Sequence, residues 1–238
     1  MIVEFTAGGL MVAGVMAYGV RGRSSSFFGP SVFRGARTRP SVALTFDDGP
    51  SESTPDLLDV LDQCGVKATF FQCGAPVRRL PEIARAVAEA GHEIGNHTYS
   101  HAALYLRSPR FIYEELLRAQ DTIGEVTGIR PRLFRAPLGA RWFGLRQAQE
   151  RLGLLGVMWT TIGRDWTLPA PKIAKRIQAG AEPGAIICLH DGRDTRPNPD
   201  VRPTIEAVRQ VIPQLRDRGF EFETVSQILC PLPTTPRN

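Results

Sequence analysis

The sequence predicts an α/β protein in which repeated βα units form a barrel, and three observations lead to this fold class. From residue 40 onward, short runs rich in β-forming residues alternate with runs of helical periodicity, as in a parallel sheet. About seven strands can be counted, and no glycine-rich nucleotide loop of a doubly wound sheet accompanies them. The length of 238 residues also suits one large α/β domain.

The individual elements follow from local patterns in chain order. The predicted strands are 42–46, 68–71, 93–95, 133–135, 155–160, 185–189 and 220–224. A first helix is predicted from Pro55, which is tolerated in a first helical turn, to the residue before Gly65. Further helices are predicted at 80–90, 109–123 and 145–152.

The chain is predicted to divide into residues 1–39, a main domain at 40–230 and a C-terminal tail at 231–238. The first part has an uncharged, mostly apolar run at 5–20 and then an Arg- and Ser-rich linker, which suggests a membrane anchor or an export signal. The run is shorter than the roughly 20 residues of a spanning helix. It also lacks a positively charged leader, and its basic residues follow it. A helix packed against the domain is therefore the alternative.

Charge and cysteine content exclude some classes of function. Five arginines against Glu4 give residues 1–39 a net charge of +4, which leaves +1 of the formal +5 for residues 40–238. Nucleic-acid binding is not expected, because its proteins concentrate basic charge on the folded domain. The four cysteines show no Cys-x-x-Cys spacing, so neither a zinc knuckle nor a redox motif is indicated.

Two adjacent carboxylates end the first predicted strand, in the stretch Thr45-Phe46-Asp47-Asp48-Gly49-Pro50. Neighbouring side chains of a strand point to opposite faces, so Asp47 and Asp48 can do different work, one on a metal and one on a substrate or water. A surface turn is the alternative interpretation, since Asp, Gly and Pro all favour turns.

Histidines supply partners for these carboxylates. His97 and His101 are four residues apart, and on one helical turn they would share a face and could chelate one cation. Together with Asp48 they would form a site of two histidines and one carboxylate, as catalytic zinc and other divalent metals use. Two unrelated surface histidines are the alternative, but three of the four histidines follow predicted strands, where α/β folds build their sites.

Three more groups follow later strands. Arg135 could hold a carboxylate in a bidentate grip, or it could be an ordinary surface arginine. Asp165 and Trp166 could line a groove for sugars, although the pair alone is uninformative. His190 ends an apolar strand, where a lone histidine is usually structural, yet its position matches that of the other groups.

Taken together, these motifs resemble the polysaccharide deacetylase family, which is carbohydrate esterase family four with a NodB-like homology domain. The resemblance covers roughly residues 40–230. The motifs occur in family order as Thr45-Phe46-Asp47-Asp48-Gly49-Pro50, His97-Thr98-Tyr99-Ser100-His101, Arg135-Ala136-Pro137-Leu138-Gly139, Asp165-Trp166 and Leu189-His190-Asp191. The family implies a distorted (β/α)7 barrel and metal-dependent removal of acetyl groups from chitin, peptidoglycan or xylan.

The resemblance also implies a role for each residue. Asp48, His97 and His101 are the expected metal ligands, with Zn²⁺ the expected ion and Co²⁺ or Ni²⁺ as alternatives. Asp47 is the expected general base, steadied by Arg135, and His190 the general acid, supported by Asp165. The backbone N–H of Leu138 is expected to hold the oxyanion, Leu189 to form the floor of the acetyl-methyl pocket, and Trp166 to contact substrate.

Two departures from the family pattern concern the substrate. Leu138 stands where many members have Tyr or Phe, and Ile162 where many have Asp. We expect N-deacetylation of an acetylated carbohydrate by a monomer in the cell envelope, with membrane association through residues 5–20; a cytoplasmic location is the alternative. An O-acetyl esterase, a non-catalytic carbohydrate-binding relative and a membrane-associated interaction protein are the alternative functions.

Overall fold

The computed structural model describes the backbone of residues 2–230 and the side chains of residues 11–230. The C-terminal tail predicted at 231–238 lies outside the described residues. The strands are β1 (Ser31–Val32), β2 (Ser41–Asp47), β3 (Thr69–Gln72), β4 (Glu93–Asn96), β5 (Leu133–Phe134), β6 (Leu155–Val157), β7 (Thr161–Ile162), β8 (Ala185–His190) and β9 (Glu221–Phe222). The helices are α1 (Ile2–Arg21), α2 (Thr54–Gln63), α3 (Gly74–Arg79), α4 (Pro81–Glu89), α5 (Pro109–Thr127), α6 (Leu145–Leu152), α7 (Ala170–Gly180), α8 (Arg202–Asp217), α9 (Val225–Leu229) and the 3-10 turn η1 (Pro137–Gly139).

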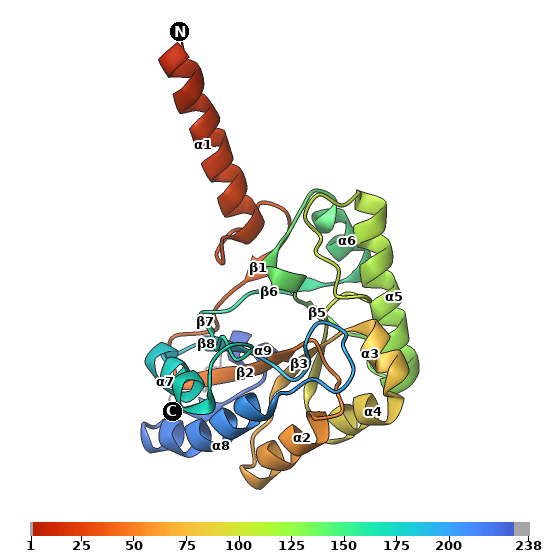
Figure 1. Cartoon of the computed structure of the whole chain (residues 1–238), viewed down its shortest axis with the longest axis vertical. Coiled ribbons are helices and arrows are strands. Elements are labelled where there is room, and N and C mark those ends of the chain that lie inside the picture. Colours follow the sequence, from red (N-terminus) through yellow and green to blue (C-terminus); the bar gives the residue numbers. More distant parts are fainter. Residues whose placement is uncertain (1, 231–238) are drawn as a thin grey trace, which may run out of the picture.

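Within the described residues, these strands form one parallel sheet in the order β1-β6-β5-β4-β3-β2-β8-β7, with β9 added beside β2. The sheet curls, and helices from α2 to α8 lie along its outside (Figure 1). The predicted α/β barrel is therefore confirmed, in its distorted form. Helices α3, α7, α8 and α9 were not predicted from the sequence.

The predicted strand at 155–160 is divided into two strands that lie in different parts of the sheet. β6 pairs with β5, whereas β7 pairs with β8. Between them, the Met158 N–H donates to the Val32 carbonyl over 2.7 Å and the Thr160 N–H donates to the Ile186 carbonyl over 2.9 Å. One continuous strand would have one set of neighbours, so the chain bends here to reach two parts of the sheet.

Strand β2 is buried at every residue and sorts its side chains between two environments. Leu44 and Phe46 belong to the main core, which the covering helices share. Thr45 and Asp47 instead face the interior of the barrel, where both accept hydrogen bonds from Arg135. The alternation of a strand thus explains how an apolar strand brings a carboxylate into the barrel.

Helix α1 projects away from the body and joins it only at its C-terminal end (Figure 1). There Val20 packs with Phe28 and Ala140, and Met16 and Trp142 border this cluster. Among the described residues we found no helix that is both long and apolar enough to cross a membrane. The last turn of α1 packs on the domain, as the alternative predicts, and the side chains of residues 5–10 in the predicted anchor lie outside the described residues.

The predicted domain boundary at residue 40 does not coincide with an edge of the sheet. β1 pairs with β6, and Arg34 forms an isolated bridge with Ala185. Residues just before the boundary thus contribute to the barrel.

Candidate active site and metal centre

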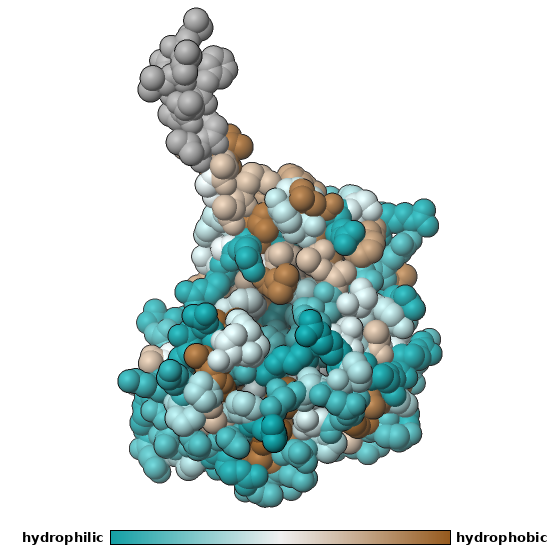
Figure 2. All heavy atoms as spheres, in the orientation of Figure 1, coloured by the Kyte–Doolittle hydropathy of each residue, from teal (hydrophilic) through white to brown (hydrophobic). Residues whose placement is uncertain are grey.

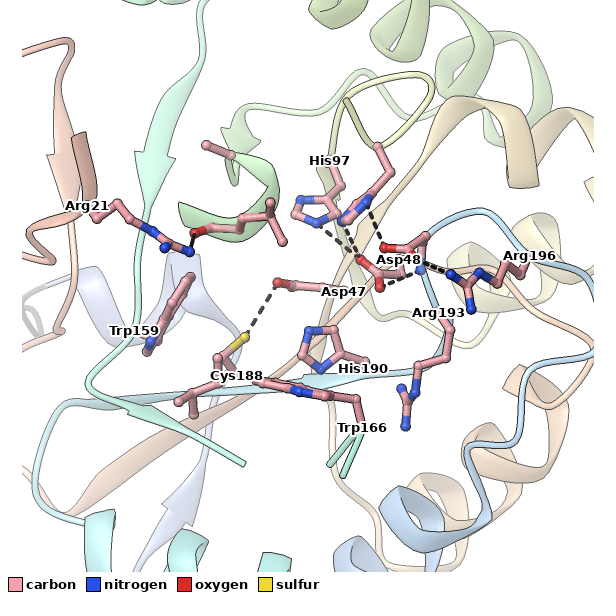
Figure 3. Close-up of a pocket in the computed structure, with 15 residues that line it drawn as sticks. Arg21, Asp47, Asp48, His97, Trp159, Trp166, Cys188, His190, Arg193 and Arg196 are labelled. Atoms are coloured by element: carbon pink, nitrogen blue, oxygen red, sulfur yellow. Dashed lines mark hydrogen bonds and ion pairs between the residues drawn. The ribbon is translucent and has the colours of Figure 1, made fainter. Parts of the chain in front are cut away.

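Side chains from the carboxyl ends of several strands converge on one cleft of about 470 Å³. Asp47 ends β2, His97 follows β4 and His190 ends β8. Figure 3 shows these side chains pointing toward one another across the cleft. Because parallel strands end at the same side of a barrel, the sequence motifs meet there although they are far apart in the chain.

Asp48, His97 and His101 form one compact group at this cleft. The Oδ1 atom of Asp48 lies 3.3 Å from Nε2 of His97 and 3.0 Å from Nε2 of His101. One ligand atom from each residue lies within 4.8 Å of the others. Atoms bound to one zinc ion at about 2.0–2.2 Å lie roughly 3–3.5 Å apart in a tetrahedral site, so these spacings suit a small divalent ion.

The second nitrogen of each imidazole supports the same interpretation. Nδ1 of His97 lies 2.8 Å from the Arg135 carbonyl oxygen, which can only accept a hydrogen bond, so this nitrogen carries the proton. Nδ1 of His101 lies 3.2 Å from Oδ1 of Asp194. The Nε2 atoms of both rings face the same carboxylate oxygen, which is how these three residues would hold a cation.

The charges of this group point in the same direction. Burial alone would raise the pKa of Asp48, but contacts with His101 and His97 outweigh it and hold that pKa well below its usual value. Burial lowers the pKa of His101, and the bond to Asp48 reverses this effect and raises it. The Asp48 carboxylate is therefore ionised, and its negative charge attracts a cation. The donor set fits a divalent metal.

Backbone geometry at this group differs from the helical turn expected for His97 and His101. The two histidines lie in the loop after β4, so that expectation is wrong, although their convergence is as predicted. Thr98 and His101 have positive φ values of 65° and 58°, and Asp48 has a φ of 73°. Non-glycine residues seldom adopt this region, and such strain is concentrated at functional sites.

Asp47 is held by a fully buried arginine. Nη1 of Arg135 donates to Oδ1 of Asp47 over 2.6 Å and also to Oγ1 of Thr45 over 2.7 Å. Its other nitrogens donate to the Val157 and Met158 carbonyls. The predicted bidentate grip is therefore wrong, because the guanidinium divides its donors between β2 and the carbonyls at the end of β6.

A second group of possible ligands, Asp47, Cys188 and His190, has ligand atoms equally close together. Burial, and then the charge of Asp47, raise the pKa of the Cys188 thiol well above its usual value. This thiol stays protonated, and the Arg135 cation already neutralises Asp47. Metals bind thiolates rather than thiols, so this second group is a poor metal site.

His190 is set up differently from the other two histidines. Its Nδ1 lies 2.9 Å from Oδ1 of Asp165, and its backbone N–H donates to Oδ2 of the same carboxylate over 2.9 Å. Thr204 donates to Oδ2 over 2.7 Å. Burial would lower the pKa of His190, but Asp165, with smaller contributions from Asp48 and Asp47, raises it to about 9. Near neutral pH the ring is therefore an imidazolium.

Two of the three predicted substrate contacts lie on the cleft wall. Leu138 is 58% exposed and Trp166 is 47% exposed, and both line the cleft together with Ile162. The ring of Trp166 stands edge-on to that of His190, with centroids 5.2 Å apart. Leu138 has a positive φ of 58°, inside η1.

The prediction for Leu189 needs correction. Its side chain is fully buried in the main core and is absent from the lining of the cleft. Side chains alternate along β8, so Cys188 and His190 face the cleft while Leu189 faces the helices.

Several residues of the site were missed by the sequence analysis. Asp194 contacts His101, and its backbone N–H donates to Oδ2 of Asp48 over 2.9 Å. Glu115 of α5 accepts hydrogen bonds from the backbone N–H groups of Tyr99 and Ser100 and so fixes the loop between the two histidines. Asp194 follows His190 closely, which was a weak signal, whereas nothing in the sequence indicated Glu115.

The chain is similar to known proteins in sequence and in fold. A sequence model of the family described as "Polysaccharide deacetylase" matches residues 34–157, which is about half of the chain. The chain belongs to the polysaccharide deacetylase family. The matched part holds Asp47, Asp48, His97, His101 and Arg135, whereas Asp165 and His190 follow it. The predicted family is thus confirmed.

Relatives with assigned names are deacetylases. Peptidoglycan-N-acetylglucosamine deacetylase PgdA of Listeria monocytogenes is 35% identical over 195 residues, covering 81% of this chain but 40% of that protein. Chitooligosaccharide deacetylase of a Bradyrhizobium strain is 38% identical over 197 residues, covering 79% of this chain and 90% of that protein. The chain therefore spans two fifths of the length of PgdA and most of the length of the rhizobial enzyme.

Solved structures of the family have the same fold. A peptidoglycan N-acetylglucosamine deacetylase matches with a TM-score of 0.78 and 32% identity, covering 84% of this chain and 92% of that chain. A CE4 family pseudoenzyme from Bacillus anthracis matches with the same TM-score of 0.78 at 25% identity, covering 86% and 71%. The fold alone therefore does not decide between an enzyme and an inactive relative, and the side chains must.

Proposed function

We propose that this chain is a metal-dependent hydrolase that removes N-acetyl groups from an acetylated carbohydrate of the chitooligosaccharide or peptidoglycan type and releases acetate. One observation carries the proposal. A metal-binding group made of Asp48, His97 and His101 and an imidazolium at His190 border the same cleft as the carboxylate of Asp47. An amide hydrolase needs these parts together, and a binding protein does not.

Asp48, His97 and His101 would hold the metal, with Zn²⁺ the first candidate and Co²⁺ or Ni²⁺ the alternatives. When bound, a divalent ion acidifies water and polarises a carbonyl oxygen. The family that matches this chain and the closely spaced ligand atoms of these three residues support this part of the proposal.

Asp47 is the proposed general base. Its carboxylate takes a proton from the water that attacks the acetyl carbonyl carbon, and the hydrogen bond of 2.6 Å from Arg135 fixes the direction of the carboxylate. Attack gives a tetrahedral oxyanion, to which the Leu138 backbone N–H is the proposed donor.

His190 is the proposed general acid. The bond between the amide nitrogen and the carbonyl carbon breaks only if that nitrogen receives a proton, because an amide anion is a poor leaving group. His190 carries that proton near neutral pH, and Asp165 orients the ring through Nδ1. The products are acetate and a free amine on the sugar.

Recognition and location complete the proposal. Trp166 and Leu138 offer exposed apolar surface on the cleft wall to a sugar ring. We propose residues 40–230 as the catalytic unit, acting as a monomer in the cell envelope, where the peptidoglycan deacetylase relatives have their substrate.

Acetate release tests the proposal. The protein, stripped of metal by chelation and then supplied with Zn²⁺, Co²⁺ or Ni²⁺, is incubated with chitooligosaccharides, peptidoglycan fragments and acetylxylan. Metal-dependent release of acetate from either N-acetylated substrate is expected. The variant Asp47→Asn should bind the same amount of metal and show no turnover, since an amide cannot accept the proton.

Two outcomes would contradict the proposal. Release from acetylxylan alone would make the chain an O-acetyl esterase. No release from any substrate with the metal fully bound would make it a non-catalytic relative, like the pseudoenzyme that shares its fold.

A further inference from the structure

The N-terminal segment contributes a cation to the catalytic cleft. Arg21, the last residue of α1, lines the cleft, and its Nη2 atom donates to the Leu138 carbonyl over 3.2 Å. Figure 3 shows the guanidinium reaching into the cleft beside Trp159. The family match begins at residue 34. Arg21 therefore lies outside the part of the chain that the family model matches.

The guanidinium of Arg21 has more N–H donors than its bond to Leu138 uses. A guanidinium carries five N–H groups, and the bond to Leu138 uses one of them. Among residues 11–230, no carboxylate forms an ion pair with Arg21. An arginine with free donors at the edge of a cleft suits an anionic oxygen of a ligand, because planar N–H pairs bind phosphate and carboxylate well.

A second cavity, of about 540 Å³, adjoins the cleft at the same arginine. Both cavities are lined by Arg21 and Leu138, so they lie next to each other. The rest of the second cavity is apolar, and we call it the α1 groove; its main walls are Ala13, Met16, Ala17 and Val20 of α1 with Tyr105 and Trp142 of the body. In Figure 2, apolar surface gathers where α1 joins the body, next to the hollow of the cleft.

The spacing of residues on α1 separates two faces. Ala13, Met16, Ala17 and Val20 recur at intervals of three and four residues, so one helical face lines the α1 groove. Val15 and Tyr18 lie on another face and are 51% and 54% exposed. This second face supplies matched control positions on the same helix.

We propose that the substrate of this enzyme is an amphiphile with three parts in a row. The acetylated sugar occupies the metal cleft, an anionic linkage of the phosphate type binds Arg21, and an apolar chain lies in the α1 groove. The order of the parts follows from the order of the surfaces, because Arg21 lies where the polar cleft meets the apolar groove. This inference rests on the proposed deacetylation and specifies the substrate class.

The first test compares matched substrates. N-acetylglucosamine linked through a phosphodiester to a dodecyl or a methyl group is used below the concentration at which micelles form. We expect a kcat/KM for the dodecyl compound at least about tenfold higher, since a single methylene in an apolar pocket can already contribute that much. Ala17→Glu should remove most of this preference, because it puts a carboxylate into the groove, whereas Val15→Glu on the other face of α1 should retain it.

The second test concerns the anionic linkage. The methyl phosphodiester is compared with the uncharged methyl glycoside of the same sugar. We expect wild type to prefer the charged compound and Arg21→Gln to reduce that preference about tenfold, as for the loss of one charge-assisted hydrogen-bonding group. Arg209→Gln on α8, which removes the same charge far from the cleft lining, is the control and should leave the preference unchanged.

A binding measurement separates this inference from the proposed reaction. Dodecyl phosphate is titrated below its micellar concentration, and tryptophan fluorescence is recorded, since Trp142 and Trp159 line the two cavities. Saturable binding that Ala17→Glu loses and Val15→Glu keeps would support the groove even if no acetate is released from any sugar. Equal binding by both variants, no saturation, or equal kcat/KM for dodecyl and methyl substrates would overturn it.

Discussion

Two aspartate–histidine arrangements lie at one cleft, but their carboxylates contact different nitrogens of the imidazole rings. In the first, Asp48 faces the Nε2 atoms of His97 and His101, whose Nδ1 atoms are occupied by the Arg135 carbonyl and Asp194. In the second, Asp165 contacts Nδ1 of His190, and that ring lines the cleft. The same residue types are therefore arranged to suit different purposes, according to which ring nitrogen the carboxylate contacts.

The comparison shows how local geometry assigns chemistry. Two Nε2 atoms that face one carboxylate oxygen can hold a cation together with it, so the first arrangement suits a metal. A carboxylate on the remote nitrogen stabilises the protonated ring, so the second arrangement suits an acid. Substitutions that affect one arrangement and spare the other test this distinction.

The largest effect is expected from the metal ligands. His97→Ala or His101→Ala leaves two protein ligands, which is too few for a catalytic site of three, so both bound metal and acetate release should fall to background. Metal content by mass spectrometry, together with acetate release, measures this effect. His92→Gln is the control, because His92 does not line the cleft and should not affect metal content. Full metal stoichiometry in His97→Ala would refute the ligand assignment.

A somewhat smaller effect is expected from the acid arrangement. Asp165→Asn should keep the metal and lower turnover about 10²–10⁴-fold, the usual contribution of general acid catalysis. The pKa of His190 is about 9, raised chiefly by Asp165 against burial, so activity that needs the protonated ring is lost as pH rises through that value. A bound cation beside Asp48 lowers this pKa, which puts the alkaline limb at or below pH 9.

The pH profile distinguishes this role from a structural one. Removing the Asp165 charge lowers the pKa of His190, so the alkaline limb of Asp165→Asn should move to lower pH. An unchanged limb with reduced turnover at every pH would mean that Asp165 acts only on the fold. Loss of metal in this variant would mean that the two arrangements are not separate.

Much of the fold could be predicted because burial follows local patterns. The apolar run at 42–46 is a buried parallel strand, and the helix opened by Pro109 lies where its turn signals indicate it should. The strand at 155–160 was misjudged, because its division depends on pairing with β5 on one side and β8 on the other. Such long-range pairing has no local signature.

Local patterns also predicted part of the site. Strand ends indicated Asp47, Asp48 and His190, but the directions of side chains came only with the fold. Leu189 alternates away from the cleft, and Arg135 divides its donors between Asp47 and backbone carbonyls. Arg21 could not be found, since only packing at the end of α1 brings it to Leu138.

A moderate effect is expected from the residue behind His101. Asp194→Asn weakens the hold on Nδ1 and should reduce metal affinity by about 10–100-fold, the usual effect of a partner behind a metal-ligating histidine. Because Asp194 is half exposed, the lower end of that range is expected. Competition with a chelator gives the affinity. Asp200→Asn, an exposed carboxylate later in the same loop, is the control. Equal metal affinities of Asp194→Asn and Asp200→Asn would show that Asp194 does not support the metal centre.

The smallest effect on turnover is expected at Leu138, where the chain departs from the family pattern. If this residue acts through its backbone N–H, the side chain can change without removing the donor, whose loss would cost roughly 10²–10³ in rate. Leu138→Tyr should therefore keep kcat within about tenfold. An added ring offers a stacking face to a sugar and narrows the cleft, so the ratio of kcat/KM values for two oligosaccharides of different length should change. A uniform collapse of kcat on both substrates, with metal bound and the fold intact, would instead involve the Leu138 side chain in the chemical step.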